Sequence, residues 1–89
     1  MRDRFGAELR RWRTERRLTQ RSLARQVWHS QESVAKIEKG ERWPSQDFAV
    51  HCDRVLGTGG VLAGLWPAVE RERLVCDRRR SAATAADAG

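Results

Sequence analysis

The side chains of this sequence that are best suited to directional hydrogen bonding lie close together between Gln31 and Lys39. A glutamine amide both donates and accepts, a lysine ammonium only donates, and a glutamate carboxylate only accepts. If the segment is a helix, Gln31 stands at its N-terminus and one face carries Glu32, Ala35, Lys36 and Lys39. Glutamine fits adenine N6 and N7, lysine fits guanine O6 or N7, and glutamate accepts from cytosine N4. We therefore expect this segment to contact DNA bases through Gln31, Glu32, Ala35 and Lys36.

Glu32 and Lys36 also have a purely structural interpretation. Side chains four residues apart on a helix are neighbours, so this glutamate and this lysine can form a surface ion pair without any ligand. Both interpretations stay open at this point.

Two short helices with separate buried faces are predicted on either side of residues 28–30. The first helix has an apolar face at spacing i, i+1 and i+4, made by Leu23, Ala24 and Val27. The second has an apolar pair three residues apart, made by Val34 and Ile37. Two buried faces require two helices.

Capping residues mark the ends of both helices. Thr19 precedes the first and Ser30 the second, and each hydroxyl can accept a hydrogen bond from a free N–H of the first turn. Gly40 suits a left-handed cap, and Pro44 cannot continue a helix because it lacks an N–H. The connection at 28–30 is short enough for the steep angle of a helix-turn-helix, whose second helix enters the major groove.

The segment from Thr19 to Pro44 resembles the phage-repressor and Cro-type (XRE) helix-turn-helix family. The family pattern runs roughly T-Q-x-x-L-A-x-x-hydrophobic-G-hydrophobic-S, then an apolar pair three residues apart, E-x-G and a proline. The matching residues are Thr19, Gln20, Leu23, Ala24, Val27, Ser30, Val34, Ile37, Glu38, Gly40 and Pro44. The resemblance implies an all-α, compact five-helix fold like that of the lambda repressor, and DNA binding.

The sequence departs from the family pattern within the turn. Trp28 stands where the family has a left-handed glycine, and His29 stands where it has a small buried aliphatic residue. A tryptophan at positive φ costs about 1 to 2 kcal/mol, so we expect either a reshaped turn or a Trp28 held by packing. Contact between Trp28 and DNA is the alternative.

The resemblance also implies residues that hold the fold and the DNA backbone. In the family, an arginine seven positions before the glutamine of T-Q pairs with the glutamate of E-x-G, and these positions hold Arg13 and Glu38. Gln20 matches a phosphate contact at a helix N-terminus. The other residues expected near phosphates are Ser30, Arg21, Arg42 and Lys39, although Ser30 also suits capping alone. Arg16 and Arg17 belong either to a solvated face or to the phosphate contacts.

Three further helices are predicted around the motif within residues 1–66. A helix over residues 3–16 repeats apolar side chains at i, i+4 and i+7, namely Phe5, Leu9 and Trp12. A fourth helix begins after Ser45 and ends at Gly57, with an inner side made by Phe48, Cys52, Val55 and Leu56. A fifth has an apolar face made by Val61, Leu62, Leu65 and Trp66. The stretch LGTGGVLAGLW at 56–66 also resembles the end of the DNA-binding domain in actinobacterial regulators.

The C-terminal part is expected to add little to the core. Residues 67–76 predict a helical extension or a short sixth helix that carries Val69 and Leu74 and could serve dimerisation. Residues 77–89 combine charge and small side chains with almost no apolar bulk, so we expect a disordered tail.

Composition favours a small basic domain that binds a polyanion. The chain has 89 residues and a net charge of +6, and residues 1–25 hold nine arginines. This length fits one domain.

No catalytic, cofactor or metal site is predicted. A whole helix separates His29 from His51, and no paired Cys/His spacing, nucleophile motif or phosphate-binding glycine loop occurs. No apolar run approaches the roughly 20 residues of a membrane span and no signal-peptide pattern occurs, so a cytoplasmic location is expected. Cys52 and Cys76 should then be free thiols.

The sequence therefore predicts a transcription regulator that binds specific double-stranded DNA, as a homodimer on half-sites about one helical turn apart. One alternative is a protein-interaction module, antitoxin-like or an adaptor, that contacts a protein through its C-terminal helices. Another is a nonspecific DNA-coating protein. Trp43 either covers the core or lies against the sugar–phosphate chain.

Overall fold

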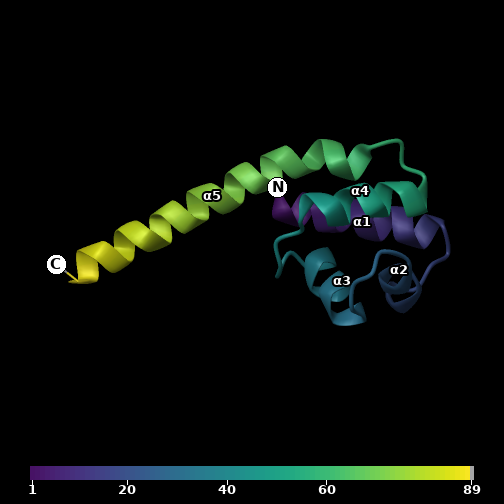
Figure 1. Cartoon of the computed structure of the whole chain (residues 1–89), viewed down its shortest axis with the longest axis horizontal. Helices are drawn as coiled ribbons and strands as arrows, with labels where there is room; N and C mark the ends of the chain where they lie inside the picture. Colours follow the sequence, from purple (N-terminus) through teal and green to yellow (C-terminus); the bar gives the residue numbers. More distant parts are fainter. Residues whose placement is uncertain (89) are drawn as a thin grey trace.

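The computed structural model describes the backbone of residues 1–88 and the side chains of residues 1–79, and this part of the chain forms helices and no strand. The helices are α1 (Arg2–Glu15), α2 (Gln20–Gln26), α3 (Gln31–Glu38), α4 (Gln46–Leu56) and α5 (Val61–Ala88) (Figure 1). The prediction of an all-α domain of five helices is confirmed.

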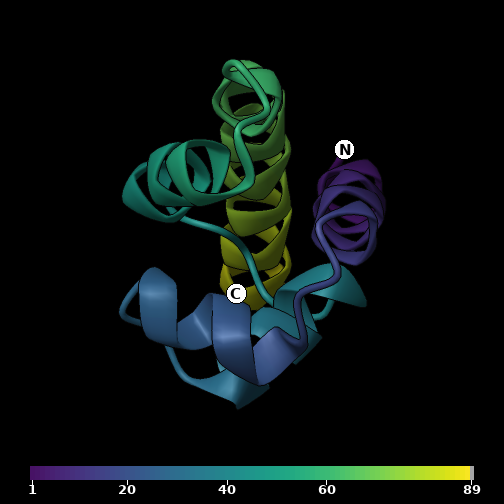
Figure 2. The same ribbon diagram turned by 90° about the vertical axis from the view of Figure 1, so that its right-hand side faces the viewer.

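The two helices of the predicted motif lie together at one edge of the molecule. In Figure 1, α2 and α3 lie below α1 and α4, while α5 runs above them and extends beyond the other helices. Figure 2 shows α1 and α4 on either side of α5, with α2 and α3 beneath. The edge formed by α2 and α3 therefore lies opposite α5.

The predicted helix starts are confirmed in detail. Thr19 caps α2 by accepting a hydrogen bond from the Ser22 N–H at 3.0 Å. Ser30 caps α3 and Ser45 caps α4 in the same way, with Ser33 and Phe48 as donors, both at 3.1 Å. Each hydroxyl replaces a partner that the first turn of a helix lacks.

Left-handed residues end α1, α2 and α3, as the C-caps of helices commonly require. Gly40 fills this position after α3 with φ +76°, but Arg17 after α1 and Trp28 after α2 are left-handed without being glycine, at φ +57° and +56°. At Trp28 the next residue, His29, donates its backbone N–H to the carbonyl of Ala24 at 2.9 Å. The turn of the motif keeps the left-handed geometry despite its tryptophan, so the expectation of a reshaped turn is wrong.

The core lies where α1, α2, α3, α4 and the start of α5 meet, and the predicted apolar faces form it. Its fully buried side chains are Phe5, Leu9, Leu23, Val27, Val34, Phe48, Cys52, Leu56, Leu62 and Val69. Trp12, Val55, Leu65 and Trp66 pack against this cluster and are partly buried. Val61 is the exception among the predicted core residues, since it is exposed at the first turn of α5.

Asp53 holds the start of α5 against α4. Its buried carboxylate accepts hydrogen bonds from the N–H groups of Leu62 at 2.9 Å and Ala63 at 2.8 Å, and from the Thr58 hydroxyl. A negative charge at a helix N-terminus is favourable because the free N–H groups there carry partial positive charge.

The structure has helix over residues 67–76, as the sequence predicted, but as part of α5, and it has helix where a disordered tail was expected. One continuous helix runs from Val61 to Ala88 and includes Pro67, so residues 67–76 extend α5 and residues 77–88 are helical. Low apolar content argues against burial but does not prevent a helix, and the Ala, Arg and Glu residues that follow Pro67 favour one. Gly89, the last residue of the expected tail, lies outside the described residues.

Gly6 sets the distance between α1 and the end of α3. A Cβ at this position would lie 2.5 Å from the carbonyl oxygens of both Ile37 and Glu38. Only a residue without a side chain allows this approach. The close contact brings α1 to the C-terminal end of α3, where Glu38 meets Arg13.

Candidate nucleic-acid interface

Arg13 of α1 and Glu38 of α3 form an ion pair that connects the two helices on the inner side of the motif. Arg13 Nε lies 2.6 Å from Glu38 Oε2 and Arg13 Nη2 lies 3.1 Å from Glu38 Oε1, a bidentate pair whose side chains are 12% and 3% exposed. Arg13 Nη1 also donates to the carbonyl of Leu18 at 2.8 Å. The planar guanidinium thus holds α3 and the α1–α2 connection with one side chain.

Gln20 joins this network, although the sequence suggested only a phosphate contact for it. Its Nε2 donates to Glu38 Oε1 at 3.2 Å. The amide nitrogen carries two hydrogens and only one is donated to Glu38, so the second stays available for another acceptor. Gln20 is the first residue of α2. The fixed spacing between T-Q and E-x-G is the sequence signal that accompanies the Gln20–Glu38 contact. The sequence does not reveal which acceptor the Gln20 amide bonds.

α3 buries Val34 and Ile37 and turns its polar residues outward, as the spacing predicted. Gln31, Glu32 and Lys39 are exposed, whereas Ala35 and Lys36 are half-buried. The four residues expected to contact bases, Gln31, Glu32, Ala35 and Lys36, therefore all reach the surface of one helix.

Glu32 and Lys36 form a surface ion pair in the free protein. Glu32 Oε1 lies 2.9 Å from Lys36 Nζ, with side chains 72% and 39% exposed. The hydrogen bond from Lys36 lowers the pKa of Glu32, and the positive charges of Lys36 and Arg42 act in the same direction. The predicted surface ion pair is thus formed, and both side chains remain accessible at the surface.

Arg42 lies beside the N-terminal half of α3, a contact that the sequence did not reveal. Its Nη1 donates to the Ser33 hydroxyl, and the Ser30 and Ser33 hydroxyls lie 3.1 Å apart. Because Arg42 comes from the segment after α3, this contact folds a cation back toward the start of the helix. Arg21, another expected phosphate contact, is exposed in the first turn of α2.

Arg16 and Arg17 differ in their surroundings. Arg16 Nε donates to the carbonyl of Leu56 at 2.7 Å, and its guanidinium lies over the Trp12 ring with 5.6 Å between them. Arg17 is exposed at its left-handed position. Arg16 thus connects α1 to the end of α4.

Aromatic rings surround the turn between α2 and α3. Trp28 is 78% exposed and meets His51 of α4 edge-on, with ring centroids 5.2 Å apart. His29 meets Phe48 of the core in the same manner at 4.8 Å. Partial burial lowers the pKa of His29, and the nearby His51 and Arg42 lower it further. Trp28 therefore packs against His51, but it is not buried.

Trp43 covers the core, which was one of its two predicted roles. It is half-buried against the hydrophobic cluster, and the guanidinium of Arg2 lies 4.2 Å from the centre of its ring. Trp66 fixes the same region by donating its indole N–H to the carbonyl of Pro44 at 3.1 Å.

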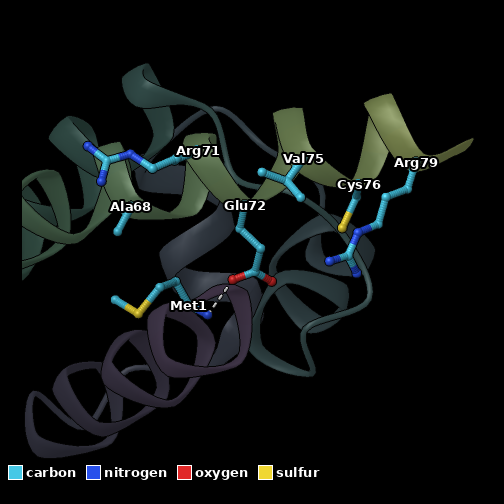
Figure 3. A pocket seen from close by; sticks show the side chains of 7 residues that line it. All are labelled: Met1, Ala68, Arg71, Glu72, Val75, Cys76 and Arg79. Atoms are coloured by element: carbon cyan, nitrogen blue, oxygen red, sulfur yellow. Dashed lines mark hydrogen bonds and ion pairs between the residues drawn. The ribbon is translucent and has the colours of Figure 1, made fainter. Parts of the chain in front are cut away.

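A second surface feature lies on α5, away from the edge formed by α2 and α3. An open groove of about 450 Å³ lies between Met1 and one side of α5, and its other lining residues are Ala68, Arg71, Glu72, Val75, Cys76 and Arg79 (Figure 3). The Met1 amino group donates to Glu72 at its floor and lowers the pKa of that carboxyl group. Val75 is 42% exposed here and Leu74 beside it is 46% exposed.

The described residues contain no group of three or more His, Cys, Asp or Glu side chains that could hold a metal ion. Within the same part of the chain, no helix is both long enough and apolar enough to span a membrane.

Comparison with known proteins agrees with the geometry. The family model described as a helix-turn-helix domain matches residues 4–66. No curated protein and no solved structure matches the chain. The match runs from α1 through α4 into the start of α5, so it includes both helices of the motif, α2 and α3. The chain belongs to the helix-turn-helix domain family, a branch of the phage-repressor and Cro-type superfamily of DNA-binding domains.

Proposed function

We propose that this protein is a sequence-specific DNA-binding transcription regulator that reads the major groove with α3. One observation carries the proposal: α3 buries Val34 and Ile37 while it presents polar side chains at the edge of the molecule opposite α5. The bidentate pair of Arg13 and Glu38 holds this helix from behind. A rigid helix with a polar outer face is what direct readout of bases requires.

Base recognition is assigned to four residues of α3. Gln31, the first residue after the Ser30 cap, can bond adenine, and the half-buried Ala35 can meet a thymine methyl group. Lys36 can donate to guanine and Glu32 can accept from cytosine, provided that their ion pair opens when DNA binds. Each correct bidentate contact discriminates against a wrong base by roughly 1 to 3 kcal/mol.

Phosphate contacts are assigned to the residues around this helix, namely Gln20, Arg21, Ser30, Lys39 and Arg42. Arg42 has the clearest support because its guanidinium already lies at Ser33, in the first turn of α3. Phosphate contacts fix the register of the protein on the duplex and carry no sequence information of their own.

A homodimer on two half-sites completes the proposal. Half-sites about 34 Å apart would place both copies of α3 on the same side of the duplex. The exposed Val75 and the groove beside Met1 give α5 a surface for the second copy. Val75→Glu should therefore weaken binding to a duplex with two half-sites while binding to a single half-site stays the same. Val61→Glu, at the exposed first turn of α5, is the control.

The same groove supports a second candidate function, a module whose main partner is another protein. A third candidate, nonspecific coating of DNA, would rest on the net charge of +6 alone.

Selection of bound duplexes from a random pool, followed by salt titration, separates the three. A specific reader enriches a two-half-site sequence, and its affinity falls with salt at a slope of about one unit per phosphate contact. Binding without enrichment would favour the coating protein, and absence of binding at physiological salt would favour the protein-interaction module.

A further inference from the structure

Trp28 is the residue of the motif whose conformation the fold explains least. Its φ of +56° strains any residue with a side chain, because Cβ crowds the following carbonyl group. Large aromatic side chains usually stabilise a fold through burial, yet Trp28 is 78% exposed. Its ring meets His51 only edge-on, at 5.2 Å. The fold therefore gains little from this side chain while it carries both strain and an exposed apolar surface.

A strained residue at an exposed position is a reason to look for function at that position. Trp28 lies three residues before Gln31, in the turn that leads into α3. His51 contacts the indole edge-on from one side, so the fold without a partner already supports this orientation of the ring. A preoriented side chain loses less conformational entropy on binding.

The surroundings of Trp28 suit a polyanion better than an apolar protein surface. His29, His51 and Arg42 lie close enough together that both His51 and Arg42 act on the pKa of His29. At the start of α3, the Ser30 hydroxyl bonds the Ser33 hydroxyl, which also accepts a hydrogen bond from Arg42. Among the described residues, the other exposed large apolar side chains lie on α4, on α5 and at the chain start: Val50, Val61, Leu74, Val75 and Met1.

We propose that Trp28 contacts the sugar–phosphate backbone of DNA beside the N-terminus of α3. The indole lies flat against a deoxyribose, and Arg42 pairs with the neighbouring phosphate. Trp28 thereby positions α3 in the groove without reading a base. This inference rests on the proposed function, and it adds a contact at the position where the family pattern has glycine.

Trp28→Gly is the informative variant because glycine adopts the left-handed conformation without strain. The variant should melt at the same temperature as the wild type or higher, and it should fold normally. Its Kd for the duplex selected by the wild-type chain should rise by about tenfold, the scale of one aromatic contact. Trp28→Phe should recover part of this loss. Val50→Ala, which also shortens an exposed apolar side chain, should bind like the wild type.

Two further readouts identify the kind of contact. An apolar contact to the sugar releases no counterion, so Trp28→Gly should leave the salt slope unchanged, whereas Arg42→Ala should reduce it by about one unit. The loss for Trp28→Gly should also be equal across single-base variants of the duplex.

Three results would overturn the inference: a Trp28→Gly affinity within twofold of the wild type, a clear drop in its melting temperature, or a loss confined to one base position. These results differ from failure of the proposed function, in which the wild-type chain itself would enrich no sequence.

Discussion

Removal of Arg13 should cost this fold a large share of its stability. In Arg13→Met, Glu38 keeps a side chain that is only 3% exposed but loses the two charged contacts at 2.6 Å and 3.1 Å. The hydrogen bond from Gln20 at 3.2 Å would be its remaining partner in the network. A buried charge that loses its partner costs about 3 to 5 kcal/mol, against a total stability of roughly 5 to 15 kcal/mol for a domain.

Adding Glu38→Leu to Arg13→Met should restore part of the lost stability. In the double variant Arg13→Met with Glu38→Leu, neither charge of this pair remains, and the carbonyl of Leu18 is the main group left without its former donor. Such a carbonyl costs about 1 to 3 kcal/mol. We therefore expect the double variant to be more stable than Arg13→Met alone.

Urea unfolding followed by circular dichroism at equal m-values measures all of these differences. Arg11→Met is the matched control, because Arg11 is 66% exposed and pairs with Glu15 at 3.5 Å on the surface, where an ion pair contributes at most about 1 kcal/mol. A double variant less stable than Arg13→Met, or an Arg13→Met no worse than Arg11→Met, would refute the reasoning.

Three other predictions follow from single sites. Burial raises the pKa of the Cys52 thiol to about 12, so a thiol reagent at pH 8 should modify the exposed Cys76 rapidly and Cys52 only on unfolding; equal rates would contradict this. Gly6→Ala should lower the melting temperature strongly, since its Cβ would meet two backbone oxygens at 2.5 Å, while Gly64→Ala, with open space around it, should not. The lowered pKa of His29 means that the unfolded chain binds more protons than the native one as pH falls below about 6.5, so acidification should destabilise the fold. In His29→Gln this pH dependence should be weaker, and an unchanged dependence would exclude His29 as its source.

The sequence was sufficient for features that depend on local chemistry. Thr19, Ser30 and Ser45 were recognisable as caps because a hydroxyl before an apolar helical face has one common use, and all three make the expected bond. The buried faces of α2 and α3 followed from their spacing for the same reason.

Features that depend on competition between forces were harder to predict. At Trp28 the sequence showed that a bulky side chain stands where the turn requires a left-handed backbone. Whether the turn would change its geometry depends on the Schellman-type hydrogen bond from His29 and on the contact with His51 of α4, neither of which the spacing reveals. The sequence predicted helix over residues 67–76, but the helix over residues 77–88 was missed because absence of apolar residues was taken as absence of a helix.

Contacts between distant segments were not predictable from spacing. The bond from Arg42 to Ser33 and the close approach at Gly6 depend on how α1, α3 and the following loop meet in three dimensions. Both belong to the environment of the candidate interface, so the sequence predicted the exposed polar face of α3 and the Arg13–Glu38 pair but not these two contacts.

The base preferences of Gln31→Ala test most directly whether α3 reads DNA. Gln46→Ala is a close control, because Gln31 and Gln46 are both exposed first residues that follow a serine cap, on α3 and α4 respectively. Affinities for every single-base variant of the selected duplex give a preference profile for each protein. We predict that Gln31→Ala loses preference at one position of each half-site and that Gln46→Ala keeps the wild-type profile. An equal loss at all positions, or no change at any, would contradict base reading by α3.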